Sequence, residues 1–180
     1  MLHDFAYGDL VFDGRRPAIF LAVDGARETG VELFSMSKSY GMAGWRLGFA
    51  LGNAEIVARI EDLQNHQFAG VFMPMQEAGI AALTGPQETV EERRAVYEAR
   101  RDRTLAALGG IETHAEGTFF VWFRLPDGIT TESLLLEHRV AVAPGEGFGE
   151  RGRGWARLSL ATADAKLDLG LARLRDLFDR

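Results

Sequence analysis

The chain has 180 residues, which is enough to bury the core of one domain or of one and a half. Its net charge is −6 and it has no run of basic residues, so composition argues against nucleic acid as a partner. The absence of cysteine excludes disulfides and cysteine-ligated metals, and it suits a reducing cytoplasm.

Membrane and metal binding are not expected either. The apolar runs are far shorter than a membrane span, and the first residues show no signal-peptide pattern. The four histidines are too scattered to suggest a metal site; they are His3, His66, His114 and His138. We therefore expect a cytoplasmic protein that acts without a metal and binds neither membrane nor nucleic acid.

The first part of the chain contains two predicted strands around an unusual segment. Leu2 to Tyr7 opens the chain, and residues 9–30 carry turn signals around a short apolar stretch. Val31 to Phe34 has the β-branched and aromatic composition of a buried strand. The segment from Ser35 to Arg46 follows, and Trp45 to Leu51 predicts a strand that leads away from it.

That segment combines one lysine with several phosphate-binding side chains. A lysine held between buried strands is poorly solvated, which favours the neutral amine that condenses with an aldehyde. Arginine binds phosphate through parallel hydrogen bonds, and hydroxyls assist it. The residues that supply these groups are Ser35, Ser37, Lys38, Ser39 and Arg46. An aldehyde and a phosphate on one molecule suggest pyridoxal 5′-phosphate. The alternative is an ordinary solvated loop, since lysine is mostly exposed in proteins.

Helices dominate the middle of the chain. Asn53 is a predicted N-cap for a helix to Phe68, with Ile56, Ile60 and Leu63 on one face. Pro74 to Leu83 predicts a second helix, and Met73 and Met75 around its start are expected to pack in the core. A long polar helix fits between the breakers at residues 84–86 and 109–110. Because such a helix commonly bridges domains, we predict a boundary between residues 85 and 86.

The last part of the chain predicts an α+β layout. Strands are expected at Gly117 to Leu125, Val140 to Ala143 and Trp155 to Ala161, with helices at Thr131 to His138 and 164–178. The glycine-rich loop at 144–149 lacks the ending and the context of a nucleotide phosphate loop.

Arg157 lies in the predicted strand at 155–161. Side chains alternate along a strand, so it shares a face with Trp155 and Ser159, while Ala156 and Leu158 face the other way. Arg157 can therefore point into a cleft, although an ordinary strand arginine is the simpler interpretation.

The lysine segment resembles a known signature. The pattern SxSK followed by a glycine-rich bend and GWRLG resembles that of class I and II aminotransferases, which share the aspartate aminotransferase fold. The resemblance implies that Lys38 binds the cofactor pyridoxal 5′-phosphate covalently and that Ser35 and Arg46 hold its phosphate.

Other motifs match the same family. HDxAY implies that Asp4 pairs with the pyridine nitrogen of the cofactor and that Tyr7 donates a hydrogen bond to its phenolic oxygen. RLSLA implies that Arg157 grips the substrate α-carboxylate. With GTFFVW and PGxxFG, the set most resembles the branch that includes diaminopimelate and alanine aminotransferases.

The resemblance also implies an organisation. It predicts an α/β fold in which residues 1–85 are the C-terminal part of the large, cofactor-binding domain and residues 86–180 are the small domain. Family members carry a long segment ahead of the aspartate, so this chain looks like a C-terminal part. We expect a homodimeric parent enzyme that transaminates an amino acid and a 2-oxo acid, and a 180-residue chain without activity of its own. The alternative is a non-catalytic aminotransferase-like domain of a regulator.

Overall fold

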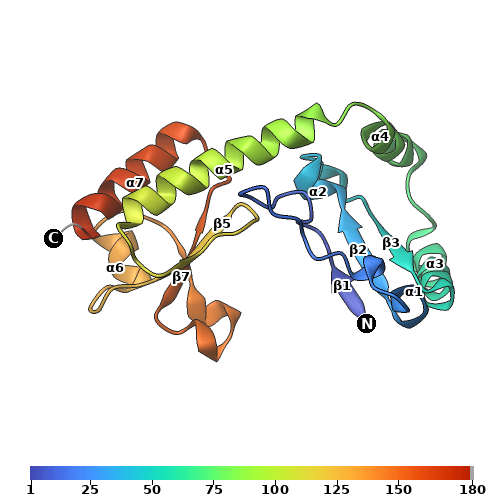
Figure 1. The fold of residues 1–180 in the computed structure, drawn as a ribbon, viewed down its shortest axis with the longest axis horizontal. Coiled ribbons are helices and arrows are strands. Elements are labelled where there is room, and N and C mark those ends of the chain that lie inside the picture. The colour runs from blue at the N-terminus through green and yellow to red at the C-terminus, as the bar shows by residue number, and fades with distance from the viewer. Residues whose placement is uncertain (179–180) are drawn as a thin grey trace. The chain divides into compact units, whose positions relative to one another are not determined.

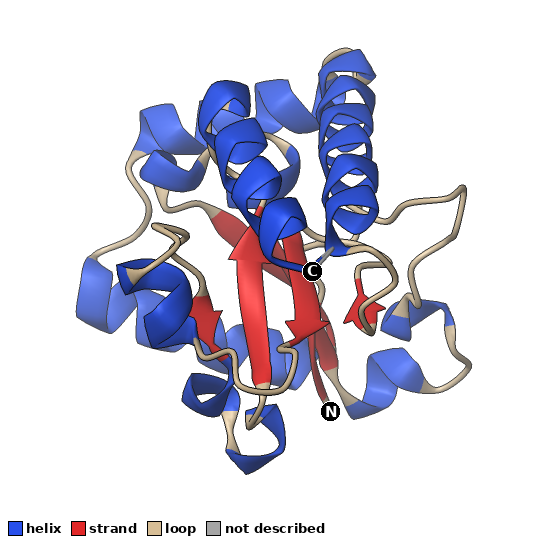
Figure 2. Ribbon diagram, turned by 90° about the vertical axis from the view of Figure 1, so that its left-hand side faces the viewer, coloured by secondary structure: helices blue, strands red, loops and turns tan. Residues whose placement is uncertain are grey.

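The computed structural model describes residues 1–178 and contains two compact units, Met1–Arg94 and Ala95–Arg180 (Figures 1 and 2). They divide within helix α5 (Glu88–Leu108), nine residues beyond the boundary predicted from sequence. The first turns of α5 belong to the first unit because Val90 is buried there and the Arg93 Nε donates a hydrogen bond to the Ser39 carbonyl at 3.1 Å.

The first unit is built on a three-stranded sheet of order β1-β2-β3. The strands are β1 (Leu2–Asp4), β2 (Val31–Ser35) and β3 (Gly48–Gly52). β1 and β2 are parallel, whereas β2 and β3 are antiparallel. The carboxyl ends of β1 and β2 and the beginning of β3 therefore lie at one end of the sheet.

The strand expected from Trp45 begins later than predicted. The residues before it form a 3₁₀ turn, η2 (Ala43–Trp45), and Arg46 then has φ 52°. A residue in this left-handed region cannot continue an extended strand, so β3 starts only at Gly48. Elsewhere in this unit the short helical segments are η1 (Phe20–Ala22), α1 (Ala26–Thr29) and α2 (Met36–Ser39).

Two longer helices, α3 (Ala54–Phe68) and α4 (Met73–Thr84), follow the sheet. The N-cap prediction is confirmed, because the Asn53 side chain accepts a hydrogen bond from the Ile56 N–H at 3.0 Å. The core prediction is wrong for Met73, which is 63% exposed, whereas Met75 is half-buried. Helix α3 has no buried residue. The Ile56, Ile60 and Leu63 side chains, which share one face of α3, are exposed in the described chain.

The second unit contains an antiparallel sheet of order β4-β5-β7-β6. Its strands are β4 (Thr113–His114), β5 (Phe120–Arg124), β6 (Ala143–Pro144) and β7 (Trp155–Ser159). The 3₁₀ turns η3 (Gly145–Phe148) and η4 (Glu150–Gly152) connect β6 to β7. The strand predicted from Val140 is shorter because the Val140 N–H donates to the Leu134 carbonyl and not to a neighbouring strand.

Helices α6 (Thr131–Leu136) and α7 (Asp164–Phe178) and the second half of α5 cover one face of this sheet (Figures 1 and 2). Each contributes to a single core with alternate residues of β5 and β7. The core includes Leu108, Val121, Phe123, Leu134, Ala156, Leu158, Leu167, Leu171 and Leu174. The opposite face of the sheet, which carries Trp122, Trp155 and Arg157, is not covered by these helices.

Charged hydrogen bonds join α5 to the beginning of α7. Arg100 binds Asp164 with two hydrogen bonds, Nε to Oδ1 at 3.1 Å and Nη2 to Oδ2 at 3.0 Å, and Arg103 Nη2 adds a third at 2.6 Å. The hydrogen bonds from Arg100 and then from Arg103 lower the pKa of Asp164. A group whose pKa is lower in the folded state than in the unfolded state stabilises the fold at pH values above its unfolded-state pKa. This contribution is lost as the pH falls through the folded-state pKa.

We therefore expect Asp164→Asn to lower the melting temperature by a few degrees at pH 7. The difference from wild type should disappear in acid, because protonation makes the wild-type Asp164 side chain neutral, as the asparagine side chain is at every pH. Thermal unfolding followed by circular dichroism across this pH range measures both effects. Asp127→Asn is the control, since Asp127 is exposed and pairs with no described residue. A melting difference that persists unchanged below the lowered pKa would contradict the assignment.

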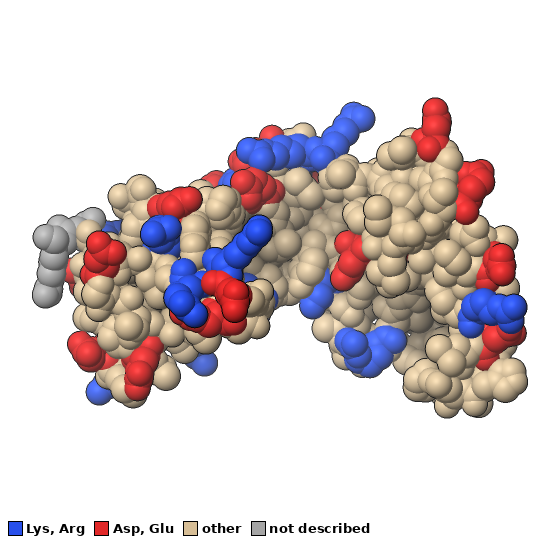
Figure 3. Space-filling view, turned by 90° about the horizontal axis from the view of Figure 1, so that it is seen from below, with Lys and Arg blue, Asp and Glu red and all other residues tan. Residues whose placement is uncertain are grey.

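The described residues support the mixed α/β architecture expected from the sequence, with an α+β second unit. Among them no helix is both long and apolar enough to cross a bilayer. On the face shown in Figure 3, acidic and basic side chains are interspersed and do not gather into a basic surface.

Candidate active site

The polar residues predicted from sequence in the first unit meet at one end of the three-stranded sheet. Asp4 is the last residue of β1 and Ser35 the last of β2, and these strands are parallel neighbours. Ser35 pairs with Gly48, the first residue of β3, so Arg46 approaches the same end. Carboxyl ends of adjacent parallel strands are where ligands bind in open α/β sheets.

Lys38 lies in the single helical turn α2 and not in an open loop. Ser35 is the N-cap of this turn, and its Oγ accepts a hydrogen bond from the Ser37 N–H at 3.2 Å. The Lys38 side chain is half-buried, and its Nζ lies 5.5 Å from the centroid of the Tyr7 ring. The turn therefore brings the predicted lysine and the predicted tyrosine together.

Arg46 lies in a constrained backbone. Its φ of 52° is unfavourable for a side chain larger than glycine, and such strain is often found at functional sites. One guanidinium nitrogen, Nη1, donates to the Ala43 carbonyl at 3.0 Å. Arg46 is exposed, and its other N–H groups have no acceptor within residues 1–178. These donors are available to an anion.

Asp4 and the three serines differ in accessibility, and two of the serines, Ser37 and Ser39, are buried. Asp4 is exposed, and its Oδ1 accepts a hydrogen bond from the Ala6 N–H at 3.1 Å. Ser35 is half-buried and, while accepting from Ser37, keeps its own O–H as a donor. Ser39 is only 1% exposed, so its hydroxyl faces the interior and does not join the predicted phosphate-binding group.

Sequence reasoning missed the residues that hold the lysine turn. Arg93, from α5, donates to the carbonyl of Ser39, which ends α2. The Tyr40 hydroxyl donates to Gln87 Oε1 at 2.9 Å. Burial, with the Asp9 carboxylate as the second cause, raises the pKa of Tyr40, so this hydroxyl remains a donor at neutral pH. No local motif identifies these contacts, which come from Gln87 and from Arg93 of α5, more than forty residues along the chain.

This donor set fits pyridoxal 5′-phosphate. A lysine amine suits its aldehyde, a hydroxyl and a guanidinium suit its phosphate, and a carboxylate suits a protonated pyridine nitrogen. A phenol next to the lysine can donate to the phenolic oxygen. The side chains concerned are Asp4, Tyr7, Ser35, Lys38 and Arg46, all placed at one end of the same sheet.

Arg157 belongs to the second unit and lies on the sheet face away from the core. Its β7 neighbours Ala156 and Leu158 are buried, as the predicted alternation requires. The Arg157 Cζ lies 4.0 Å from the centroid of the Phe120 ring and 4.3 Å from that of Phe148. The arginine is thus held by aromatic contacts, which sequence reasoning did not foresee.

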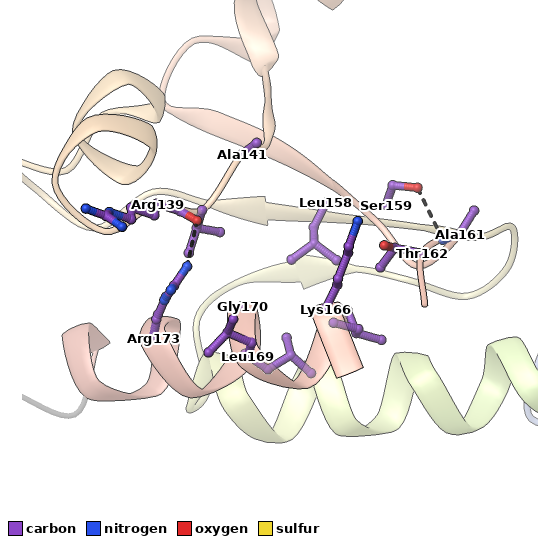
Figure 4. Close-up of a pocket in the computed structure, with 13 residues that line it drawn as sticks. Arg139, Ala141, Leu158, Ser159, Ala161, Thr162, Lys166, Leu169, Gly170 and Arg173 are labelled. Carbon is purple, nitrogen blue, oxygen red and sulfur yellow. Dashed lines mark hydrogen bonds between the residues drawn. The ribbon is translucent and has the colours of Figure 1, made fainter. Parts of the chain in front are cut away.

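A cavity of about 430 Å³ lies on the other side of β7, against α7 (Figure 4). Leu158 and Leu167 line it, and Lys166 reaches into it. Arg173 Nη1 donates to the Arg139 carbonyl at 3.0 Å at one end. None of the residues predicted for catalysis or binding lines this cavity.

Comparisons with known proteins agree with the predicted family. The family model "Aminotransferase class I and II" matches residues 1–174. The chain is 44% identical over 184 residues to the L-glutamine--4-(methylsulfanyl)-2-oxobutanoate aminotransferase of Bacillus subtilis, with 98% of this chain and 46% of the relative covered. It is 41% identical over 179 residues to an LL-diaminopimelate aminotransferase of Dehalococcoides mccartyi, with 96% and 46% covered.

Solved structures give the same result. An aminotransferase from Staphylococcus aureus superposes with a TM-score of 0.91 at 39% identity, covering 99% of this chain and 49% of that one. Substrate-bound BacF from Bacillus subtilis gives 0.90 at 36% identity, with 98% and 47% covered. The chain spans about half the length of these relatives. The match over nearly its whole length shows that it belongs to the class I and II aminotransferases.

Proposed function

We propose that this chain forms part of a pyridoxal 5′-phosphate-dependent aminotransferase that moves an amino group between an amino acid and a 2-oxo acid. The observation that supports this most is the convergence of Asp4, Ser35, Lys38 and Arg46 at the carboxyl end of the β1–β2 pair, with Tyr7 beside the lysine. The chain spans about half the length of its relatives, so the activity is proposed for a protein of their length that contains this chain. We call that protein the whole enzyme.

Each residue has a distinct proposed role. The cofactor, when bound, supplies an electron sink that stabilises negative charge at the substrate Cα. Lys38 anchors it and then moves a proton to and from the substrate Cα as general acid and base. Asp4 holds the proton on the pyridine nitrogen, and Tyr7 donates a hydrogen bond to the phenolic oxygen. Ser35 and Arg46 hold the phosphate.

Arg157 is the proposed substrate anchor. An arginine and a carboxylate form a planar pair with two parallel hydrogen bonds, which fixes orientation as well as position. Within the described residues, the Arg157 guanidinium makes ring contacts but no hydrogen bond or ion pair. Its N–H groups are therefore available to a substrate carboxylate.

Covalent labelling tests the proposal. The 180 residues contain two lysines, Lys38 and Lys166, so borohydride reduction of the whole enzyme with bound cofactor, followed by peptide mapping, distinguishes between them and any lysine outside this chain. We expect a pyridoxyl label on Lys38 alone. A label on Lys166, or on neither lysine, would refute the proposed role of Lys38.

We expect the 180-residue chain alone to show no measurable transaminase activity. Its proposed phosphate ligand Arg46 and its proposed ring partner Asp4 are both exposed, and positioning supplies much of the rate of an enzyme. A coupled assay for 2-oxo acid formation measures this, with the whole enzyme as the positive control. Turnover at a rate comparable to that control would contradict the expectation.

We also propose that the whole enzyme is a homodimer. Apolar side chains exposed on the first unit include Leu63, Phe68, Phe72 and Met73, more than a monomer usually leaves in water. Light scattering of the whole enzyme is expected to give twice the chain mass. A monomer that is fully active would contradict the proposal.

A further inference from the structure

The outer face of the second sheet carries a continuous row of aromatic rings. The His114 and Trp155 rings stack with centroids 5.5 Å apart, and Trp155 stacks on Trp122 at 6.0 Å and 14°. Trp122 and Phe148 form an edge-to-face pair with centroids 5.5 Å apart and ring planes at 84°. This row of four side chains, His114, Trp155, Trp122 and Phe148, ends at Arg157.

Arg157 is in contact with rings from two different elements. Phe120 comes from β5 and lies 4.0 Å from the guanidinium carbon, while Phe148 comes from η3 and lies 4.3 Å from it. A ring that lies over a guanidinium attracts it and restricts its rotation, but leaves the N–H groups in its plane for other partners. Among residues 1–178 the guanidinium has no hydrogen-bond acceptor, so these two ring contacts are the interactions that restrict it.

The η3 turn that carries Phe148 is itself closely packed. A Cβ added to Gly145 would lie 2.1 Å from the Gly152 carbonyl oxygen, and one added to Gly152 would lie 2.0 Å from that of Gly145. Only glycine permits this approach of η3 to η4. By contrast, Gly147 has open space around its Cβ position and no left-handed φ. The turn is therefore fixed at its base, and Phe148 projects from it onto Trp122 and Arg157.

We infer that Phe120 and Phe148 are positioning residues that hold the Arg157 guanidinium ready for a substrate carboxylate. This inference rests on the proposed role of Arg157 as the carboxylate anchor. Since a long arginine side chain loses considerable rotamer freedom on binding a ligand, rings that restrict it beforehand reduce that loss. Phe148 acts through Arg157 and need not touch the carboxylate.

Steady-state kinetics of the whole enzyme tests the inference. Phe148→Leu keeps an apolar side chain but removes the ring, and we expect it to raise the KM for the 2-oxo acid about 3- to 30-fold, the effect of one cation–π contact, with kcat unchanged. Phe148→Tyr keeps the ring and is expected to retain the wild-type KM. The pair Gly145→Ala and Gly147→Ala gives a second comparison, in which only the first raises KM.

The KM of Arg157→Ala is measured in parallel to separate the proposed carboxylate anchor, Arg157, from the inferred positioning role of Phe148. If Arg157→Ala leaves KM unchanged, the carboxylate anchor is wrong and the inference falls with it. If Arg157→Ala raises KM but Phe148→Leu does not, the anchor stands and the positioning role of Phe148 is overturned.

A spectroscopic measurement on the 180-residue chain avoids dependence on turnover. Ring currents from Phe120 and Phe148 should shift the Arg157 Nε–H proton resonance upfield. We expect Phe148→Leu and Phe120→Leu each to move this resonance downfield, and Phe148→Tyr to leave it near its wild-type position. A resonance that is insensitive to both leucine variants in a folded chain would overturn the inference.

Discussion

Lys38→Ala is expected to lower kcat of the whole enzyme by about 10²- to 10⁴-fold or more, which is the range for loss of a positioned general acid and base. The variant also loses the covalent attachment of the cofactor. Neither effect should disturb the fold, because the Lys38 side chain is half-buried and α2 is capped by Ser35 independently of it.

The other lysine in the chain supplies a matched control. Lys166 lies in α7 of the second unit and lines the cavity against β7. Lys166→Ala is expected to keep the wild-type kcat and the wild-type covalent label on Lys38. Steady-state kinetics and borohydride labelling are measured on both variants, with circular dichroism as a check on folding. Near-normal turnover by a folded Lys38→Ala enzyme would remove Lys38 from the mechanism.

Sequence reasoning predicted well what depends on local pattern. The helices at 54–68 and 164–178 follow from caps and apolar spacing, and the strand at 31–35, predicted over 31–34, follows from its composition, although only its first two residues are buried. The alternation that places Arg157 opposite Leu158 is a property of any strand. These features need no knowledge of distant contacts.

The errors arose where distant or unusual backbone contacts decide the outcome. A left-handed φ at Arg46 delayed β3, and a hydrogen bond from Val140 to Leu134 shortened β6. Apolar periodicity in α3 correctly predicted a helix but not its burial, because an apolar face is buried only where another element covers it.

The sequence predicted the motif residues of the candidate site but not the contacts that support them. The motifs identified residues that the strand ends then placed together, namely Asp4, Tyr7, Ser35, Lys38 and Arg46. They assigned no supporting role to the residues that hold the lysine turn and Arg157 in place. Arg93 and Phe148 make these contacts through tertiary packing. No motif includes Arg93, and PGxxFG includes Phe148 without indicating that its ring lies against Arg157.

Arg157→Ala is expected to raise the KM for the carboxylate substrate, at a cost on the order of 2–5 kcal/mol, the range for truncating one member of a buried charged pair. Cofactor affinity should hardly change, because the proposed cofactor ligands all lie in the first unit. Arg157→Lys keeps the charge but loses the planar fork, so most of the KM effect should remain.

Arg124→Ala is the control, since Arg124 is exposed on neighbouring β5 and lies 3.9 Å from Glu112 at the surface. Substrate titrations and cofactor binding measured on the same preparations decide the matter: equal losses of substrate and cofactor affinity in Arg157→Ala would mean that the arginine supports the fold and does not anchor the carboxylate.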